Sequence, residues 1–310
     1  MANYLVTGAA GFIGSALAKD LILKGNTVVT IDNLSTGKES NIPTGCKFIK
    51  GNTYDKDIIS KLDDYSFDAV FHIAGQSSGE ISFENPIYDL STNTASTLLL
   101  LEYCKKHGVK KFVYASSMST YGDHEEELVD ENSKTEPKSF YAVGKLASEN
   151  YMRIFSSFGI QCTALRFFNV FGYGQNLDNL KQGMASIYLA MALKDGHIVV
   201  KGSKDRFRDF VHVKDVVSAC ELAITIPRDE KFDVFNVANC RKIKVEYIIK
   251  TIQSNIPGTT VEYILGTPGD QFGIYGKNDK IRHKLGWNPT INFEEGMKDF
   301  IEKTKTYFQN

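Results

Sequence analysis

The chain has 310 residues and a mass of 34.6 kDa, with 42% apolar and 24% charged residues and a net charge of −1. This composition excludes the disordered and fibrous classes, and the near-zero net charge gives no support for binding to nucleic acid or to an anionic membrane. The length allows one large domain or two smaller ones, and we expect two.

Five cysteines are scattered singly, without the CxxC or Cys/His spacing of a metal site. Their odd number favours reduced thiols, and hence a cytoplasmic protein, over a disulfide framework. No apolar run reaches the length of a membrane span, and the residues after Met1 lack the basic and apolar regions of a signal peptide. We therefore expect no metal, no nucleic acid and no membrane as a partner. The cysteines are Cys46, Cys104, Cys162, Cys220 and Cys240.

Short β-branched runs alternate with helical stretches as far as residue 166, at the spacing of βαβ units. This pattern predicts a doubly wound parallel sheet with helices on both faces, the Rossmann type of α/β fold. The predicted strands are residues 4–7, 27–31, 47–49, 69–72, 111–115 and 162–166, and the predicted helices include 15–24, 92–106 and 141–158. After Phe167 the regularity weakens, and residues 172–183 form a loop-rich stretch. The change marks a second, smaller C-terminal domain.

The first predicted strand runs into Thr7-Gly8-Ala9-Ala10-Gly11-Phe12-Ile13-Gly14, and a helix follows. Glycines here let the chain turn tightly and bring backbone amides close to a pyrophosphate, which the positive end of the helix stabilises. The spacing is GxxGxxG, whereas the usual dinucleotide fingerprint is GxGxxG. Taken alone, the trio fits an ordinary strand–helix turn equally well.

Asp32 strengthens the dinucleotide interpretation, because it ends the second predicted strand. A carboxylate there can accept hydrogen bonds from both ribose hydroxyls of an adenosine. It would repel a 2′-phosphate, so NAD is favoured over NADP. Asn33-Leu34-Ser35-Thr36-Gly37 follow as a loop on the adenosine side. The alternative is a solvated acid at a strand end.

Leu98-Leu99-Leu100-Leu101 lie in the predicted helix 92–106, and four consecutive positions sweep most of a helix circumference. One sheet cannot cover them all, so a second element must bury the far face. Either another helix of this chain or the partner subunit of a homodimer meets this requirement.

Tyr141-Ala142-Val143-Gly144-Lys145 opens a predicted helix and places Tyr141 and Lys145 on one face. The lysine charge favours the phenolate, which makes tyrosine a general base for a hydroxyl proton. Most YxxxK pairs are structural. Here, however, strand 111–115 runs into Ser116-Ser117-Met118-Ser119-Thr120-Tyr121-Gly122, at the end of a parallel strand where such sheets bind ligands. A serine there either hydrogen-bonds a reacting oxygen or caps the strand end.

These motifs resemble those of the extended short-chain dehydrogenases/reductases that modify nucleotide sugars, and the resemblance covers nearly the whole chain. Their order and spacing are more specific than any one of them. Besides the glycine trio, Asp32-Asn33-Leu34, Ser116-Ser117 and the Tyr141/Lys145 pair, they include Tyr121-Gly122, Arg166-Phe167-Phe168-Asn169-Val170, Arg208-Asp209-Phe210-Val211-His212-Val213, Pro268-Gly269-Asp270 and Leu285-Gly286-Trp287-Asn288-Pro289.

The resemblance implies a catalytic role for Ser117, which would also contact substrate, with Tyr141 as the base and Lys145 tuning it and holding the nicotinamide ribose. It implies NAD as cofactor, with Asn52 and Thr53 at the adenine. The implied cofactor-binding residues are Gly8, Gly11, Phe12, Ile13, Gly14, Asp32, Asn33, Ser35, Thr36, Gly37, Asn52, Thr53, Ala74, Gly75, Thr92, Tyr141, Lys145 and Phe168.

The resemblance also implies that Asn169 and Arg208 hold the pyrophosphate of a nucleotide sugar, a task that suits the forked donors of arginine. The alternative for Arg208 is membership of a solvated basic run with Lys201, Lys204 and Arg206. By the same resemblance, residues 1–167 are the NAD-binding Rossmann domain and 168–310 are mainly the substrate domain, with the segment near 208–226 returning to the first.

Three positions depart from the family pattern. Asn52 replaces the usual aspartate at the adenine, where its carbonyl can still accept a bond from the amino group. Gly144 replaces the serine of the usual YxxSK, a change we expect to matter little. Thr267 stands where an arginine usually assists the substrate phosphates, which leaves the nucleotide and its pose open.

Relatives with this triad perform 4-epimerisation, 4,6-dehydration, decarboxylation or reduction of nucleotide sugars. Those that eliminate water carry an Asp-Glu pair directly after the catalytic hydroxyl residue, where this chain has Met118-Ser119. Without that acid and base, elimination has no evident catalyst. We therefore expect an NAD-dependent 4-epimerase of a UDP-hexose that works through a transient 4-keto sugar with tightly bound NAD. The alternatives are another sugar-nucleotide oxidoreductase, such as a 4,6-dehydratase or 4-dehydrogenase, and a non-catalytic NAD-binding module.

Overall fold

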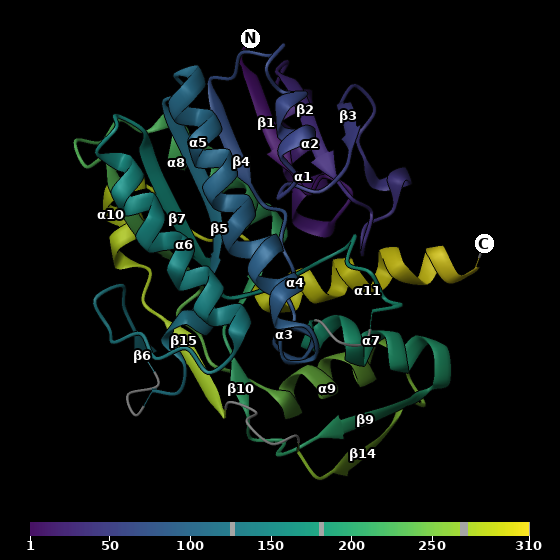
Figure 1. Cartoon of the computed structure of the whole chain (residues 1–310). Helices are drawn as coiled ribbons and strands as arrows, with labels where there is room; N and C mark the ends of the chain where they lie inside the picture. The colour runs from purple at the N-terminus through teal and green to yellow at the C-terminus, as the bar shows by residue number, and fades with distance from the viewer. Residues whose placement is uncertain (125–127, 180–182, 267–271, 310) are drawn as a thin grey trace.

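The computed structural model describes residues 1–124, 128–179, 183–266 and 272–309. At its centre lies a parallel sheet of seven strands in the order β12-β7-β5-β4-β1-β2-β3 (Figure 1). This arrangement confirms the predicted α/β fold of the Rossmann type. The strands are β1 (Asn3–Thr7), β2 (Thr27–Asp32), β3 (Lys47–Lys50), β4 (Ala69–His72), β5 (Lys111–Ser117), β7 (Gln161–Phe167) and β12 (Phe232–Val237).

The six predicted strands are present, with ends within two residues of the expected ones, whereas β12 was not predicted. A parallel sheet covered on both faces favours nearly continuous apolar runs, and all four residues of β4 are buried. The predicted helices are also present, although the first begins at Phe12, three residues early, because the chain enters it directly from Gly11.

Helices cover both faces of the sheet (Figure 1). On one face, α1 (Phe12–Leu23) and α8 (Val213–Thr225) bury side chains such as Leu17 and Cys220 against the central strands β1, β5 and β7. On the other face, α5 (Ser96–His107) and α6 (Phe140–Ser156) bury Leu100 and Met152, and the short α2 (Lys56–Ser60) lies beside α5.

The helix predicted at 92–106 is preceded by a π-helical turn, Ser91–Ala95. In the leucine run, Leu100 and Leu101 are fully buried in the sheet-facing core. Leu98 and Leu99 are half-buried. Packing within the chain therefore covers most of the run, and two of the four leucines keep some exposed surface.

The chain leaves β1 for β2 and β3 on one side, and later places β4 on the other side. The connections at the carboxyl ends of β1 and β4 therefore diverge, which leaves a crevice where open α/β sheets bind their ligands. Short elements follow β4 and β5 there. They are α3 (Gly79–Glu84), α4 (Pro86–Leu90) and the 3₁₀ turn Met118–Tyr121, and a further 3₁₀ turn, Glu39–Asn41, follows β2.

The remaining elements pack beyond this edge of the sheet (Figure 1). Phe171, Leu189, Ile248 and Met297 lie at the centre of their separate core. The helices are α7 (Met184–Asp195), α9 (Val245–Asn255) and α11 (Phe293–Gln309); the strands are the parallel pairs β8 (Asn169–Phe171) with β11 (Phe210–His212) and β9 (His197–Lys201) with β14 (Thr260–Ile264), and the sheet β13 (Ile243–Lys244), β10 (Phe207–Arg208), β15 (Gly273–Gly276) and β6 (Leu128–Val129).

After residue 168 the chain crosses back to the first part more than once. α8 packs on α1, and β12 pairs with β7 along its whole length. α10 (Asp279–Leu285) and Trp287 join the core beneath α1 and α8. Within the described part of the chain, no helix has both the length and the apolar character needed to cross a membrane.

Candidate active site

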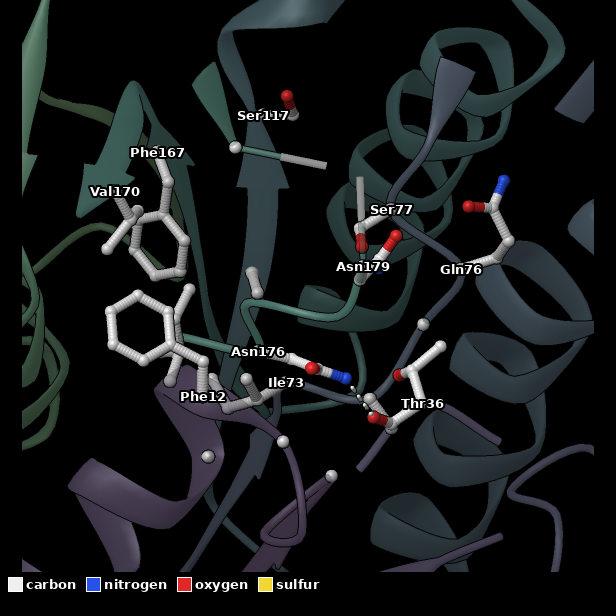
Figure 2. A pocket seen from close by; sticks show the side chains of 18 of the residues that line it. Phe12, Thr36, Ile73, Gln76, Ser77, Ser117, Phe167, Val170, Asn176 and Asn179 are labelled. Atoms are coloured by element: carbon white, nitrogen blue, oxygen red, sulfur yellow. Dashed lines mark hydrogen bonds between the residues drawn. The ribbon is translucent and has the colours of Figure 1, made fainter. Parts of the chain in front are cut away.

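One large cleft, of about 1210 Å³, opens at the carboxyl ends of the central strands. Figure 2 shows Phe12, Ile73 and Thr36 toward one end of it and Ser117, on β5, toward the other. All the predicted site residues lie on its wall, which brings together positions from nine parts of the sequence. They are Gly8, Gly11, Phe12, Ile13, Gly14, Asp32, Asn33, Ser35, Thr36, Gly37, Asn52, Thr53, Ala74, Gly75, Thr92, Ser117, Tyr141, Lys145, Phe168, Asn169 and Arg208.

The glycine turn is packed too tightly for side chains. Gly8 has a φ of +81°, and a Cβ atom there would lie 2.9 Å from the Cα of Ala74. A Cβ on Gly14 would lie 2.1 Å from the carbonyl oxygen of Gly8, so only glycine lets α1 start this close to β1. Gly11, the N-cap residue, has no side chain to cap the first helical amides. This backbone geometry fits the close approach of a pyrophosphate.

Asp32 is buried and fixed, unlike a solvated acid at a strand end. Its Oδ2 accepts the amide of Ala10 at 2.9 Å, and its Oδ1 accepts the amide of Leu34 at 2.8 Å. Each carboxylate oxygen keeps a lone pair for a further donor. At the adenine position, Asn52 replaces the usual aspartate of the family. Asn33 Nδ2 donates to Asn52 Oδ1 at 2.8 Å, so the side-chain carbonyl expected to face adenine already has one partner.

Ser117 and Tyr141 meet at the inner end of the cleft. Ser117 Oγ accepts hydrogen bonds from the amide of Ser119 at 3.2 Å and from its hydroxyl at 3.0 Å. Desolvation by the surrounding protein raises the pKa of Tyr141 to about 12, although a hydrogen bond with Ser117 acts in the opposite direction. In the chain by itself, burial therefore outweighs the stabilisation of the phenolate that the Tyr141/Lys145 spacing predicts.

Lys145 is held within the protein rather than in solvent. Its Nζ donates to the carbonyl of Ala115 at 2.8 Å and lies 4.7 Å from the centre of the Tyr114 ring and 5.6 Å from that of Tyr141. Burial lowers the pKa of Lys145 to about 8, while Asp89 and Glu149 counteract this effect. The ammonium is thus close enough to act on Tyr141 by its charge without a direct hydrogen bond.

Arg208 and Asn169 come from strands of two different sheets in the second part, β10 and β8. Arg208 is 7% exposed, which contradicts the alternative of a solvated basic run. Its Nη1 donates to the carbonyls of Phe207 and Phe272, and burial together with Arg206 lowers its pKa to about 10. Asn169 Nδ2 donates to the carbonyl of Asp209 at 3.2 Å. Both side chains are therefore preoriented on the cleft wall.

Two features at the cleft were not predicted. Behind the wall, Asp209 is buried beside Arg208, and its carboxylate accepts the amides of Asn239 at 2.9 Å and Gly276 at 3.2 Å, which joins three segments of the second part. Residues 173–179 also line the cleft, and Asn176 Nδ2 donates to the carbonyl of Thr36 at 3.4 Å (Figure 2). These contacts join residues that are far apart in the sequence, so they can be seen only in the structure. Thr267 lies outside the described residues.

Comparisons with known proteins agree with this architecture. Residues 4–238 match the NAD dependent epimerase/dehydratase family. The chain is 31% identical over 318 residues to the UDP-glucose 4-epimerase of Mycolicibacterium smegmatis, which covers 99% of this chain and 98% of that protein.

Two solved structures are similar over almost their whole length. The UDP-glucose 4-epimerase of Thermotoga maritima with UDP-glucose superposes with a TM-score of 0.94 at 32% identity, covering 99% of each chain. The UDP-glucose 4-epimerase of Thermus thermophilus in complex with NAD gives a TM-score of 0.89 at 30% identity, covering 97% of this chain and 98% of that one.

Proposed function

The chain belongs to the NAD dependent epimerase/dehydratase family, and we propose that it inverts C4 of a UDP-hexose, interconverting UDP-glucose and UDP-galactose. It is an NAD-dependent nucleotide-sugar epimerase. The observation that carries the 4-epimerase proposal is the single cleft in which the glycine turn, Asp32, Ser117, Tyr141 and Lys145 meet.

The residues at one end of the cleft fit NAD. The turn Gly8–Gly14 would hold the pyrophosphate by backbone amides, and Asp32 has a lone pair on each oxygen for the adenosine ribose. Lys145 would hold the nicotinamide ribose. When bound, NAD supplies the acceptor, and then the donor, of the C4 hydrogen.

At the other end, Tyr141 would remove the proton from the C4 hydroxyl and later return it. Ser117, oriented by both bonds from Ser119, would hydrogen-bond the same oxygen. Arg208 and Asn169, on β10 and β8, would hold the pyrophosphate of UDP and so keep the hexose near these hydroxyls. If the 4-keto sugar turned its other face to the cofactor between removal and return of the proton, the product would be the C4 epimer.

Elimination of water lacks its usual residues. Met118 Sδ lies 3.6 Å from Asn169 Nδ2, and the Ser119 hydroxyl is bonded to Ser117. The other described carboxylates on the cleft wall, Glu80, Asp123 and Asp178, come from other segments. If one of these three acids took the place of the missing pair, the product analysis described next would detect a sugar that has lost water.

Product analysis tests the proposal. The purified protein should be incubated with UDP-, GDP-, CDP- and dTDP-hexoses, and the products examined by mass spectrometry and NMR. We expect an isomer of unchanged mass from UDP-glucose, with deuterium placed at C4 retained at C4 and no solvent deuterium at C5. Loss of water, a released 4-keto sugar or solvent label at C5 would show a different reaction within the same family.

We also propose a homodimer formed through α6. Its outer face carries an apolar stripe at helical spacing, with Phe140, Val143, Tyr151 and Ile154 between 37% and 60% exposed. Leu90 on α4, which packs against α6, extends the apolar surface. A contiguous apolar patch of this kind marks a protein interface. Ile154→Asp should convert the protein to monomers in sedimentation analysis, and a wild-type monomer would contradict the proposal.

The division into an NAD-binding domain (1–167) and a mainly substrate-binding domain (168–310) remains part of the proposal. Its support is that the two parts have separate apolar cores and that α8 and β12 lie with the first. We propose the cytoplasm as the compartment, because the five thiols are free, and three of them, including Cys104 and Cys220, are buried.

A further inference from the structure

Asp89 is a buried carboxylate behind the cleft that the proposed reaction does not yet use. It lies on α4 and is 1% exposed. Its Oδ1 accepts a hydrogen bond from Gln76 Nε2 at 2.8 Å and another from Asn93 Nδ2 at 3.0 Å. Both donors are neutral amides, and among the described residues Asp89 has no cationic partner within ion-pair distance. A buried charge held in this way is costly unless a cation lies nearby.

The ammonium of Lys145 is the cation that Asp89 acts on. Asp89 is the larger of the two carboxylate influences that raise the pKa of Lys145. Burial raises the pKa of Asp89, and the hydrogen bonds from Gln76 and Asn93 together with the charge of Lys145 counteract this effect. The second carboxylate, Glu149, is already paired with Arg166, whose Nε and Nη2 donate to it at 2.9 and 2.7 Å. Its charge is therefore largely balanced, and that of Asp89 is not.

Asp89 and the backbone carbonyl of Gln76, which also accepts a hydrogen bond from Asn93 Nδ2 at 3.0 Å, together fix the orientation of Asn93. An ionised carboxylate only accepts hydrogen bonds, so Asn93 must turn its Nδ2 toward Asp89 and its Oδ1 the other way. Asn93 Oδ1 is buried without a hydrogen-bond partner among the described residues. A Cβ on Gly75 would lie 2.4 Å from this oxygen and 3.4 Å from Lys145 Nζ, so the two atoms flank the same point of the cleft wall.

Gly144, which stands where the family usually has serine, lies against the carboxylate of Asp89. A Cβ there would be 3.5 Å from Asp89 Oδ2 and 3.2 Å from Thr94 Oγ1. The usual serine of the family would thus bring a hydroxyl to Asp89, which could share its charge. With glycine there is no such hydroxyl, and the charge of Asp89 is left to act on Lys145.

We propose that Asp89 is a positioning residue of the active site, whose buried negative charge keeps Lys145 protonated and helps to hold the Asn93 oxygen beside Gly75, behind the cleft wall. The inference rests on the proposed function, because the ammonium matters only if Tyr141 exchanges a proton. The other ionisable groups around Lys145 are Glu149 on α6, His72 on β4, Tyr114 on β5 and Tyr141. Burial lowers the pKa of His72 to about 3, so it is neutral at working pH.

Lys145 must be an ammonium, so activity falls as pH rises through its pKa. Removal of the Asp89 charge makes Lys145 release its proton at lower pH. The same charge raises the pKa of Tyr141, so that its removal makes the phenolate easier to form. Both titrations therefore move to lower pH, whereas a loss of packing alone would lower kcat at every pH.

The test compares NAD-loaded wild-type enzyme with Asp89→Asn, which keeps the shape and removes the charge. We expect the alkaline fall of kcat for UDP-glucose to move down by about one pH unit, the lower end of what a nearby opposite charge contributes. Asp89→Glu should keep the wild-type profile whatever its kcat. Glu84→Gln, which removes an exposed acid at the end of α3, is the matched control and should change nothing.

A second readout does not need turnover. The ultraviolet titration of the wild-type protein minus that of Tyr141→Phe isolates the Tyr141 phenolate, and this difference should appear at lower pH in the Asp89→Asn background. If Asp89→Asn fails to fold, the smaller neutral Asp89→Ser takes its place. An unshifted alkaline limb and an unshifted phenolate titration would overturn the inference. A wild-type enzyme that holds NAD but epimerises no UDP-hexose would instead overturn the proposed function, and the titration would still test Asp89.

Discussion

Replacing Gly14 with alanine should release NAD from the protein while leaving most of the fold in place. The Cβ of the new residue would lie 2.1 Å from the carbonyl oxygen of Gly8 and 3.0 Å from the amide nitrogen of Ala9. These atoms belong to the backbone of the turn, so they cannot rotate away. The start of α1 must move outward by more than ~1 Å before the contact becomes ordinary.

Such a shift has two consequences of different size. Overpacking of this kind costs about 1–3 kcal/mol of folding free energy. The displaced amides would also lose their hydrogen bonds to the pyrophosphate, each worth about 1.5–3 kcal/mol to a charged group. Loss of two such bonds weakens NAD binding by about 3 kcal/mol or more, which is roughly a hundredfold in Kd.

The assay measures the nicotinamide nucleotide retained through purification, followed by the Kd of added NAD and the Tm. Gly79→Ala is the matched control, because a Cβ at Gly79 meets only ordinary contacts, the nearest being Ser139 Oγ at 3.8 Å. Wild-type NAD content and Kd in Gly14→Ala would refute the reasoning that close packing at this glycine holds the pyrophosphate site.

Other substitutions test the remaining roles. Tyr141→Phe should lower kcat by about 10²–10⁴-fold with little change in substrate binding, and Ser117→Ala should lower it less; near-native turnover by Tyr141→Phe would contradict its role as the base. Asp32→Ala should weaken NAD binding by about 1–3 kcal/mol in calorimetry; equal binding of NADP and NAD to the unaltered protein would exclude the selectivity assigned to Asp32. Arg208→Lys should raise the KM for UDP-glucose by about tenfold while NAD content stays the same, because lysine keeps the charge and loses the fork; an unchanged KM would remove Arg208 from the pyrophosphate site.

The sequence predicted the fold where local pattern is sufficient. Continuous apolar runs and the glycine turn identified six of the seven strands of the central sheet. The seventh, β12, carries Asp233 and Asn236 among apolar residues, and both are buried. Several of their partners are distant in sequence: Lys280 Nζ lies 3.0 Å from Asp233, and Tyr121 donates to Asn236 at 2.6 Å. A buried strand that contains polar residues lacks the continuous apolar run by which a strand of a parallel sheet is predicted from sequence.

The same limit applies to the cleft. The Tyr141/Lys145 pair and the glycine turn were visible because their spacing is itself the signal. Asp89 was not, because its importance depends on a hydrogen bond from Gln76, thirteen residues earlier in sequence, and on the charge of Lys145 on another helix. The contact between Asn176 and Thr36 joins residues that are 140 positions apart in the sequence. No periodicity predicts such pairs.

Asp32 shows why the structural and functional interpretations of one residue need not exclude each other. Its carboxylate accepts the amides of Ala10 and Leu34 and so holds the glycine turn and the adenosine-side loop in place before any nucleotide binds. The lone pairs left over are those that would receive the ribose hydroxyls. Removing the carboxylate therefore perturbs the pocket as well as the ligand contact. The loss of NAD affinity in Asp32→Ala therefore measures the ribose bonds only if the variant keeps the wild-type Tm in the absence of nucleotide. The melting curve of the nucleotide-free variant must be measured together with the calorimetry.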